Sequence, residues 1–340
     1  MADPIIVLFV VVGLALLFDF SNGWHDAANA IATVVSTRVL SPMQAVLLAG
    51  ILNVAGAFMS TAVAKMVGGG IVDPSAINQA AVGAALVGAL SWNFLTLFWG
   101  LPTSSSHALL GGMVGAALAQ GGLAAVKVHG LVTVLQALLF SPLAGFVVGY
   151  FILVGIFWLT FRASRAKANT AFRRLQLVSS SLMAFSHGSN DAQKVMGIIT
   201  LALVSGGMLE HVEVPTWVIM SCALTMGVGT MIGGWRIIRT LGMRIFKMEP
   251  VHGFSAETSA AMILLGTAHF GLPVSTTHTI ASSIMGVGSV SRFSAVRWGV
   301  TMRIVSAWIF TLPTVAFMGL FFMLSLILQK LWRLSCVICG

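Results

Sequence analysis

Long apolar runs, each interrupted at one place by a short polar motif, constrain how this chain can fold more than any other feature. The run from Pro4 to Val35 contains Ser-Asn-Gly-Trp-His-Asp between Ser21 and Asp26. A related motif, Phe-Ser-His-Gly-Ser-Asn-Asp-Ala-Gln-Lys, occupies residues 185–194 within a second apolar run. An unpaired charge in hydrocarbon costs about 2.5 to 3.5 kcal/mol or more. Both motifs are therefore predicted to be parts of a site.

The composition indicates an integral membrane protein. Charged residues make up 8% of the 340 residues and hydrophobic residues 58%, whereas about 25% of a soluble domain is charged. At about 20 residues per helical crossing, the chain is an all-α polytopic protein without a soluble domain, expected in the plasma (inner) membrane. The net charge of +9 is explained by basic cytoplasmic loops and does not indicate nucleic-acid binding. Three cysteines cannot form a disulfide framework.

Two repeats of one architecture are predicted. Each consists of a broken helix around the polar motif, a span, a re-entrant helical hairpin and a long span with an internal proline, Pro142 or Pro313. The hairpin tips read Gly-Leu-Pro-Thr-Ser-Ser-Ser-His at 100–107 and Gly-Leu-Pro-Val-Ser-Thr-Thr-His at 271–278. The first repeat covers residues 1–161, a basic cytoplasmic linker 162–176, and the second repeat 177–340.

The second repeat is predicted to be inverted relative to the first. Each repeat crosses the membrane three times net, because a hairpin returns to the side from which it came. Most Lys and Arg residues then fall on one side, which the positive-inside bias assigns to the cytoplasm, and both termini are external. The two tips enter from opposite faces and meet near the midplane, as in secondary transporters with inverted repeats.

The two polar motifs and the two Gly-Leu-Pro-x-Ser-x-x-His tips resemble the PiT family of inorganic phosphate transporters over nearly the whole chain. The resemblance implies cation-coupled symport of phosphate by an inverted-repeat homodimer, without a cofactor or a resident metal. Trp24 and His25 stand where the wider family has Ala and Asn, as in bacterial members that use protons. The coupling ion is therefore H+ or Na+, and the substrate is phosphate alone or a metal–phosphate complex. Some relatives are sulfate permeases, which keeps that alternative open.

The tips are the expected substrate site for such an anion. A helix begins after Pro102 and after Pro273, so unpaired N–H groups and the positive end of a helix dipole face each tip. Hydroxyl groups add donors, although Ser and Thr also cap helices, which accounts for one or two per tip. The predicted substrate-binding residues are Thr103, Ser104, Ser105, Ser106, Ser275, Thr276 and Thr277, with Asn29 and Gln193.

The two motif aspartates are predicted to hold the coupling cation. A carboxylate beside phosphate requires a cation, and hard cations prefer carboxylate and amide oxygens. The predicted cation-binding residues are Asp26, Asn29, Asn190 and Asp191. A structural alternative is a buried aspartate that stabilises a helix break by hydrogen bonds.

Lys194 and His25 are candidates for an ion-pair or proton role. Lys194 follows Asp191 by three residues on the same helix face, which favours pairing, and Gln193 is assigned to the place of Asn29. His25 titrates near neutrality and could carry a proton. The roles of His107, His278 and Glu257 stay open.

Two other functions are less consistent with the pattern. A membrane-embedded hydrolase would need an asymmetric catalytic set, whereas the polar groups here are duplicated. An anion channel would need a pore lined by Lys or Arg, and the chain has no such ring. A transporter that is not an enzyme is the favoured interpretation.

Overall fold

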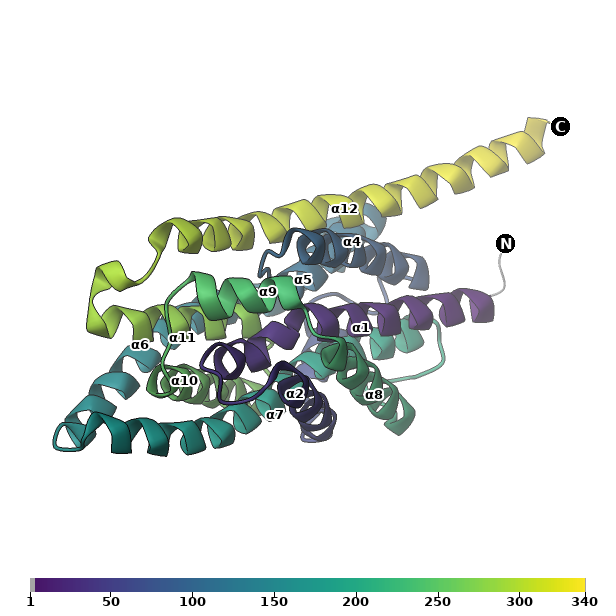
Figure 1. Cartoon of the computed structure of the whole chain (residues 1–340). Helices are drawn as coiled ribbons and strands as arrows, with labels where there is room; N and C mark the ends of the chain where they lie inside the picture. The colour runs from purple at the N-terminus through teal and green to yellow at the C-terminus, as the bar shows by residue number, and fades with distance from the viewer. Residues whose placement is uncertain (1–3, 340) are drawn as a thin grey trace.

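The computed structural model describes residues 4–339, and the side chains of residues 5–332 (Figure 1). The regular elements of this part are helices, and one isolated bridge joins Val72 to Val126. The elements are α1 (Pro4–Ser36), α2 (Pro42–Ala57), α3 (Ala62–Lys65), η1 (Met66–Gly70), α4 (Gln79–Trp99), α5 (Ser105–Gly121), η2 (Gly122–Ala125), α6 (Val128–Thr160), α7 (Arg165–Ser205), α8 (Thr216–Ile232), α9 (Trp235–Arg239), η3 (Thr240–Arg244), α10 (Pro250–His269), α11 (Thr276–Ser291), η4 (Phe293–Ala295) and α12 (Trp298–Cys339).

The predicted all-α multi-pass fold is confirmed. Among the described residues, five helices are long and apolar enough to cross a membrane, or up to seven if each of two bent pairs forms one span. The chain leaves helix at both predicted tips, between α4 and α5 and between α10 and α11. Pro142 lies inside α6 and Pro313 inside α12, as expected for the two long spans.

The prediction of broken first helices is wrong. α1 and α7 each run through their polar motif as one helix of 33 and 41 residues. The breaks lie instead in the elements predicted to be plain spans. The helices bend by 68° between Pro42–Ala57 and Ala62–Gly70, and by 61° between Thr216–Ile232 and Trp235–Arg244.

The motif glycines explain this difference, because they permit close packing of helices. A Cβ atom on Gly23 would lie 2.3 Å from the carbonyl oxygen of Met226 in α8. A Cβ atom on Gly188 would lie 2.2 Å from the carbonyl oxygen of Asn53 in α2. Small residues at membrane helix interfaces let two backbones approach. The sequence predicted a helix break at each polar motif, whereas in the structure the motif glycine is a contact point between two continuous helices.

The basic segment is helical. α7 begins at Arg165 with Ser164 as its N-cap, so most of the predicted linker, residues 162–176, forms the first turns of that helix. Arg165 pairs with Glu249 over 2.7 Å at the surface. Its side chain is 87% exposed, and surface pairs of this kind contribute little to stability.

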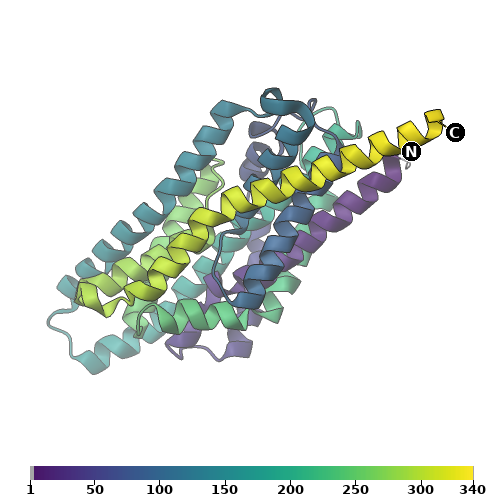
Figure 2. The same ribbon diagram turned by 90° about the horizontal axis from the view of Figure 1, so that it is seen from above.

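Helices from the two halves of the sequence pack against each other in matched pairs. α1 packs on α8 and α7 on α2, while α5 packs on α12 and α11 on α6. α1 and α7 run in opposite directions, and the N-terminal end of α1 and the C-terminal end of α12 lie at the same end of the molecule (Figures 1 and 2). Helices of each half therefore bury part of their surface against helices of the other half.

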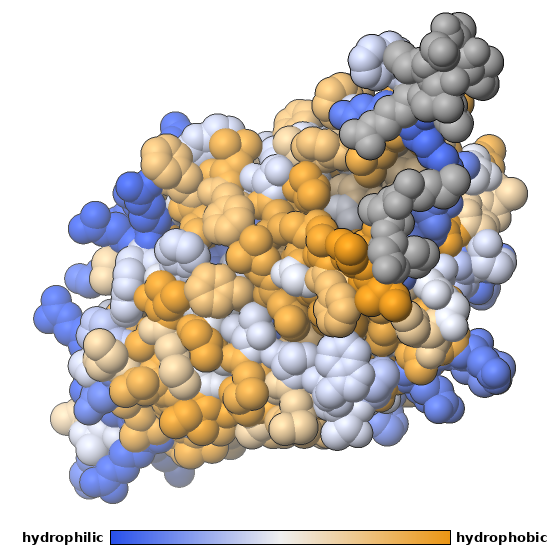
Figure 3. Space-filling view, turned by 90° about the vertical axis from the view of Figure 1, so that its right-hand side faces the viewer, coloured by the Kyte–Doolittle hydropathy of each residue, from blue (hydrophilic) through white to orange (hydrophobic). Residues whose placement is uncertain are grey.

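The surface carries large exposed apolar side chains, whereas the acids of the two polar motifs are buried in the interior. Figure 3 shows apolar residues across the middle of one face, with hydrophilic residues gathered toward its edges. Leu159 is 86% exposed and Phe9 72%, whereas Asp26 and Asp191 are at most 1% exposed. The apolar surface suits lipid contact. The homodimer implied by the family resemblance stays a prediction.

Candidate functional site

The same local chemistry shapes both hairpin tips. Gly100 after α4 and Gly271 after α10 have φ values of 67° and 68°, a left-handed conformation that glycine adopts without strain. Ser104 Oγ accepts the N–H of the third residue after it over 3.1 Å, and Ser275 Oγ does the same over 3.2 Å. These two serines are therefore N-caps of α5 and α11, and the following hydroxyls are left for other partners.

The two tips are in direct contact. Ser106 Oγ of the first tip donates to the carbonyl oxygen of Val274 in the second over 3.1 Å. Asn29 Nδ2 of α1 donates to the hydroxyls of Thr277 over 2.9 Å and Thr276 over 3.2 Å. All five residues are at most 8% exposed. The N-termini of α5 and α11 thus converge on one buried point between α1 and α7.

The Asp26 carboxylate accepts hydrogen bonds from hydroxyls of both tips. Ser105 Oγ donates to its Oδ2 over 3.1 Å, and Thr277 Oγ1 donates to its Oδ1 over 3.5 Å. The same Oδ1 lies 2.7 Å from Nδ1 of the adjacent His25. The other ring nitrogen of His25 lies 3.2 Å from the hydroxyl of Thr96. The imidazole therefore bridges the acid and α4.

Asp191 lies at the corresponding place on α7 but has different partners. Thr276 Oγ1 donates to its Oδ2 over 2.9 Å, and His187 Nε2 lies 3.3 Å from the same oxygen. Lys194 forms an ion pair with Oδ1. Lys194 Nζ also donates to Ser106 Oγ over 2.6 Å and to the backbone carbonyl oxygen of Val274 over 2.8 Å.

Lys194 is the structural counterpart of Asn29, which corrects the assignment of Gln193 to that place. Each is the third residue after its aspartate, and each donates to the tip of the opposite repeat. Gln193 donates to the carbonyl oxygen of Ser189, and its side-chain oxygen accepts the Val63 N–H over 2.9 Å. Both polar ends of Gln193 are therefore engaged away from the tip hydroxyls.

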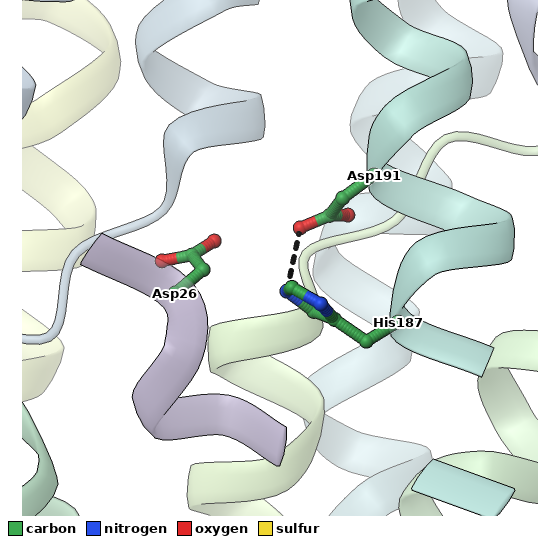
Figure 4. A group of neighbouring side chains, drawn as sticks. All are labelled: Asp26, His187 and Asp191. Carbon is green, nitrogen blue, oxygen red and sulfur yellow. Dashed lines mark ion pairs between the residues drawn. The ribbon is translucent and has the colours of Figure 1, made fainter. Parts of the chain in front are cut away.

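Three side chains from α1 and α7 converge at the centre (Figure 4). One ligand atom each from Asp26, His187 and Asp191 lie within 4.8 Å of one another, and all three residues are buried. Two carboxylates and an imidazole can hold a hard cation, or a proton shared between acids. His187 lies in the second polar motif but is not among the site residues predicted from the sequence. Its partner on α2, Asn53 Oδ1, lies 3.0 Å from its Nδ1.

Asn190 is buried, but the structure does not link it to the other predicted cation-binding residues. It is 0% exposed, and neither of its side-chain polar atoms has a hydrogen-bond partner among the described residues. Thr103 is likewise fully buried, and its hydroxyl lies 3.5 Å from His25 Nε2. Thr103 thus reaches the acid only through the imidazole.

The two tip histidines lie behind the site. The rings of His107 and His278 are tilted against each other with centroids 4.5 Å apart, and His278 stacks on Trp308 at 4.0 Å. Trp308 Nε1 donates to the carbonyl oxygen of Pro102 over 2.9 Å. This aromatic column ties both tips to α12, which is a structural role.

Glu257 belongs to a separate buried network. Thr33 Oγ1 donates to its Oε1 over 2.5 Å and Gln176 Nε2 over 3.0 Å, while Ser179 donates to Oε2. The network joins α1, α7 and α10, because each contributes at least one of these side chains. A carboxylate with three donors is held in place by the fold.

The sequence analysis did not identify several polar residues that each stand alone within an apolar span. Asn53, Thr96 and Thr230 are each at most 1% exposed. Asn53 Nδ2 donates to Thr230 Oγ1 over 2.8 Å. The signal that could have found them is the rarity of polar residues at membrane depth, where each such residue marks a functional or packing contact.

Comparisons with known proteins concern the family and the fold of the chain. Residues 22–319 match the profile of the phosphate transporter family. The chain is 46% identical over 329 residues to a probable low-affinity inorganic phosphate transporter of Bacillus subtilis, covering 95% of this chain and 98% of the relative. It is 46% identical over 318 residues to a protein of the same description from Rhizobium meliloti, covering 93% and 95%. A solved structure described as the sodium-dependent phosphate transporter has a TM-score of 0.84 at 24% identity, covering 95% of this chain and 99% of that one.

Proposed function

The chain belongs to the phosphate transporter family, and on that premise we propose that it is a secondary active symporter that imports inorganic phosphate together with H+ or Na+. The observation that carries the proposal is the convergence of two helix N-termini, two acids and one lysine at a single buried point. The contact between Ser106 and Val274 brings the tips together, and Lys194 reaches both.

Phosphate binds between the tips in this proposal. The first N–H groups of a helix have no intrahelical partner and carry partial positive charge, and such groups bind phosphate. α5 and α11 supply two sets of these donors at one place. The hydroxyls of Ser105, Ser106, Thr276 and Thr277 complete the site. Ser104 and Ser275 shape it as caps, and Lys194 adds a positive charge.

The coupling cation binds on the Asp26 side. Lys194 already neutralises Asp191, whereas no Lys or Arg is paired with Asp26 among the described residues. Asn29 Oδ1 is buried without a hydrogen-bond partner there, one helical turn from Asp26. Carboxylate, amide and hydroxyl oxygens suit a sodium ion, and the carboxylate with His25 suits a proton. Bound phosphate and bound cation then stabilise each other, which produces coupling.

Alternating access follows from the two-fold arrangement. We infer inverted repeats, supported by the opposite directions of α1 and α7 (Figure 1) and by the matched packing of helices from the two halves. A site at the junction of such repeats opens to either side when one set of helices moves against the other.

The test is uptake into proteoliposomes. Radiolabelled phosphate and sulfate are offered under separately imposed sodium and proton gradients, with and without a chelator of divalent cations. We expect phosphate to accumulate above its equilibrium level under one of the gradients, and sulfate to remain low. Chelation lowers uptake if the cargo is a metal–phosphate complex. The variant Glu210→Gln, in an exposed loop before α8, is the matched control and should transport as the wild type does.

Two outcomes would overturn the proposal. Preferential accumulation of sulfate would identify a sulfate permease of the same fold. Phosphate flux that only ever runs down its own gradient, without any effect of the cation gradients, would identify a passive pathway.

A further inference from the structure

Asp19 is an acid inside the membrane-spanning part of α1 that the transport site does not use. It lies in the apolar run before the first polar motif, and its side chain is 0% exposed. Neither carboxylate oxygen has a hydrogen-bond partner among the described residues. The contrast with Glu257 is clear, since Glu257 is held by three donors. An ionisable residue at this depth marks a functional site by default.

Asp19 shares one face of α1 with the transport site. The residues at alternating intervals of three and four, namely Asp19, Asn22, Asp26, Asn29 and Thr33, form a polar stripe along the helix. Each of them is at most 1% exposed. Asp19 precedes Asp26 by two helical turns, about 10 Å along the axis. Asn22 lies between them, and its side-chain oxygen also has no partner in the part of the chain that the structure describes.

No Lys, Arg or His of the described residues forms an ion pair with Asp19. The titratable groups that act on it are Asp191 of α7 and the Cys222 thiol of α8, and α4 contributes no titratable side chain over Gln79–Trp99. Lys194 is engaged by Asp191. A negative charge at Asp19 would therefore face a second acid in a dry environment, which is strongly unfavourable. The carboxyl group needs a bound cation to remain there.

A proton suits this carboxyl group better than a metal ion, because neither carboxylate oxygen has a polar partner within hydrogen-bond distance among the described residues. Hard metal cations take several oxygen ligands. Beside Asp19, the polar stripe contributes one further side-chain oxygen ligand, that of Asn22. A proton needs one carboxylate oxygen only.

The second repeat has no such acid. The corresponding position on α7, seven residues before Asp191, is Ala184, which is 1% exposed. Asp19 is therefore not required by the two-fold architecture, nor does a carboxylate attract an anion. Its place on the N-terminal side of Asp26 puts it toward the end of α1 that the distribution of basic residues predicts to be external.

We propose that Asp19 is a proton-binding site on the external side of the transport site, which takes a proton from the outside and passes it to Asp26. The proton leaves external water and binds the Asp19 carboxylate. It then moves along the polar stripe past Asn22 to the Asp26 carboxylate as the next proton from the outside binds Asp19, so that Asp19 does not remain ionised. This inference rests on the proposed symport and specifies its cation.

The experiment compares net uptake with exchange in proteoliposomes. For each protein, accumulation of radiolabelled phosphate is measured under a pH gradient of about one unit, and phosphate–phosphate exchange is measured at equal pH. One coupled proton contributes about tenfold to the accumulation ratio per pH unit. In Asp19→Asn we expect that ratio to fall about tenfold, while exchange, which needs no net proton movement, continues. Asp19→Glu should restore accumulation with a shifted pH profile.

Several outcomes overturn the inference. The first is wild-type accumulation by Asp19→Asn, and the second is equal loss of accumulation and exchange without rescue by Asp19→Glu. If Asp19→Asn does not fold, as judged by gel filtration and thermal unfolding, an unchanged pH profile in Asp19→Glu rejects the proposal. Wild-type phosphate uptake driven by sodium alone would reject Asp19 as the proton site and leave the symport intact. A wild-type protein that transports no phosphate under any gradient would reject the symport itself.

Discussion

The two motif aspartates occupy equivalent places on α1 and α7, yet their surroundings differ in charge. Asp191 is paired with Lys194 and lies beside His187. Asp26 lies beside His25 and two tip hydroxyls, and the position equivalent to Lys194 is the neutral Asn29. The scaffold is thus symmetric and the site is not. In the proposed symport, the second half contains its own cation in Lys194, and the first half takes a cation from solution.

The largest effect is expected from breaking the buried ion pair. Asp191→Asn leaves the Lys194 charge buried without a counter-ion, which typically costs about 3–5 kcal/mol. Asp26→Asn removes hydrogen bonds only, which costs about 1–2 kcal/mol. In thermal unfolding in detergent, the midpoint of Asp191→Asn should therefore lie well below that of Asp26→Asn. The double variant Asp191→Asn, Lys194→Gln should recover most of this difference in midpoint. Equal losses in the two single variants would show that the halves do not differ in charge.

The scaffold, in contrast, should respond equally in both halves. Gly23→Ala and Gly188→Ala each place a Cβ atom within 2.3 Å of a backbone oxygen, and such overpacking costs about 1–3 kcal/mol. Gly13→Ala is the control, since no atom lies within 4 Å of its Cβ position. Replacing glycine in a helix by alanine without a clash stabilises by about 0.5–1 kcal/mol. Unfolding midpoints that fall for Gly23→Ala but not for Gly188→Ala would contradict the matched packing.

Lys194→Asn should make the second half a copy of the first. The variant then needs a second cation from solution where Lys194 stood. When the coupling cation is below saturation, a tenfold rise in its concentration should raise wild-type uptake about tenfold. For Lys194→Asn, which binds two cations, the same rise should increase uptake about 100-fold. The measurement is initial phosphate uptake against cation concentration. An unchanged slope with normal uptake would mean that Lys194 does not replace a coupling cation.

The smallest effect is expected at the two N-caps. Ser104→Ala and Ser275→Ala each remove one capping hydrogen bond, which costs about 1 kcal/mol. The losses from the caps should agree closely, because both tips use the same cap geometry, and Ser104→Ala additionally removes the 2.8 Å contact between Ser104 Oγ and His107 Nδ1. Ser181→Ala, on the exposed face of α7, serves as the control and should leave the unfolding midpoint unchanged. A much larger loss at one tip would show that its serine does more than cap the helix.

Local chemistry explains which parts of the fold could be predicted from sequence. Apolar runs long enough to span a membrane predicted the helices. The Gly-Leu-Pro tips predicted the interruptions, because glycine adopts a left-handed conformation and the residue before a proline disfavours the helical conformation. Pro142 and Pro313 were placed correctly inside long helices. These features depend on residues close together in the chain.

Features that depend on distant partners were predicted less well. A glycine beside polar residues suits either a break or a close contact, and only the position of α8 against Gly23 decides between them. Gln193 was assigned to the place of Asn29, although the spacing from the aspartate already matches Asn29 to Lys194, and the contact of Lys194 with the opposite tip agrees with that match. Asp19 was not noticed, since its lack of partners is a property of the packed protein.

Sequence alone determined that this chain lies in the membrane, that it carries two related halves and that each half brings one acid and one hydroxyl-rich tip. Tertiary structure decided which of these groups meet, which helices bend and which acid is paired. The physical reason is the range of the interactions involved. Hydrophobic burial and backbone conformation follow from a residue and its neighbours, whereas the state of a buried charge depends on side chains that only the packing of α1 against α7 and the tips brings within a few ångströms.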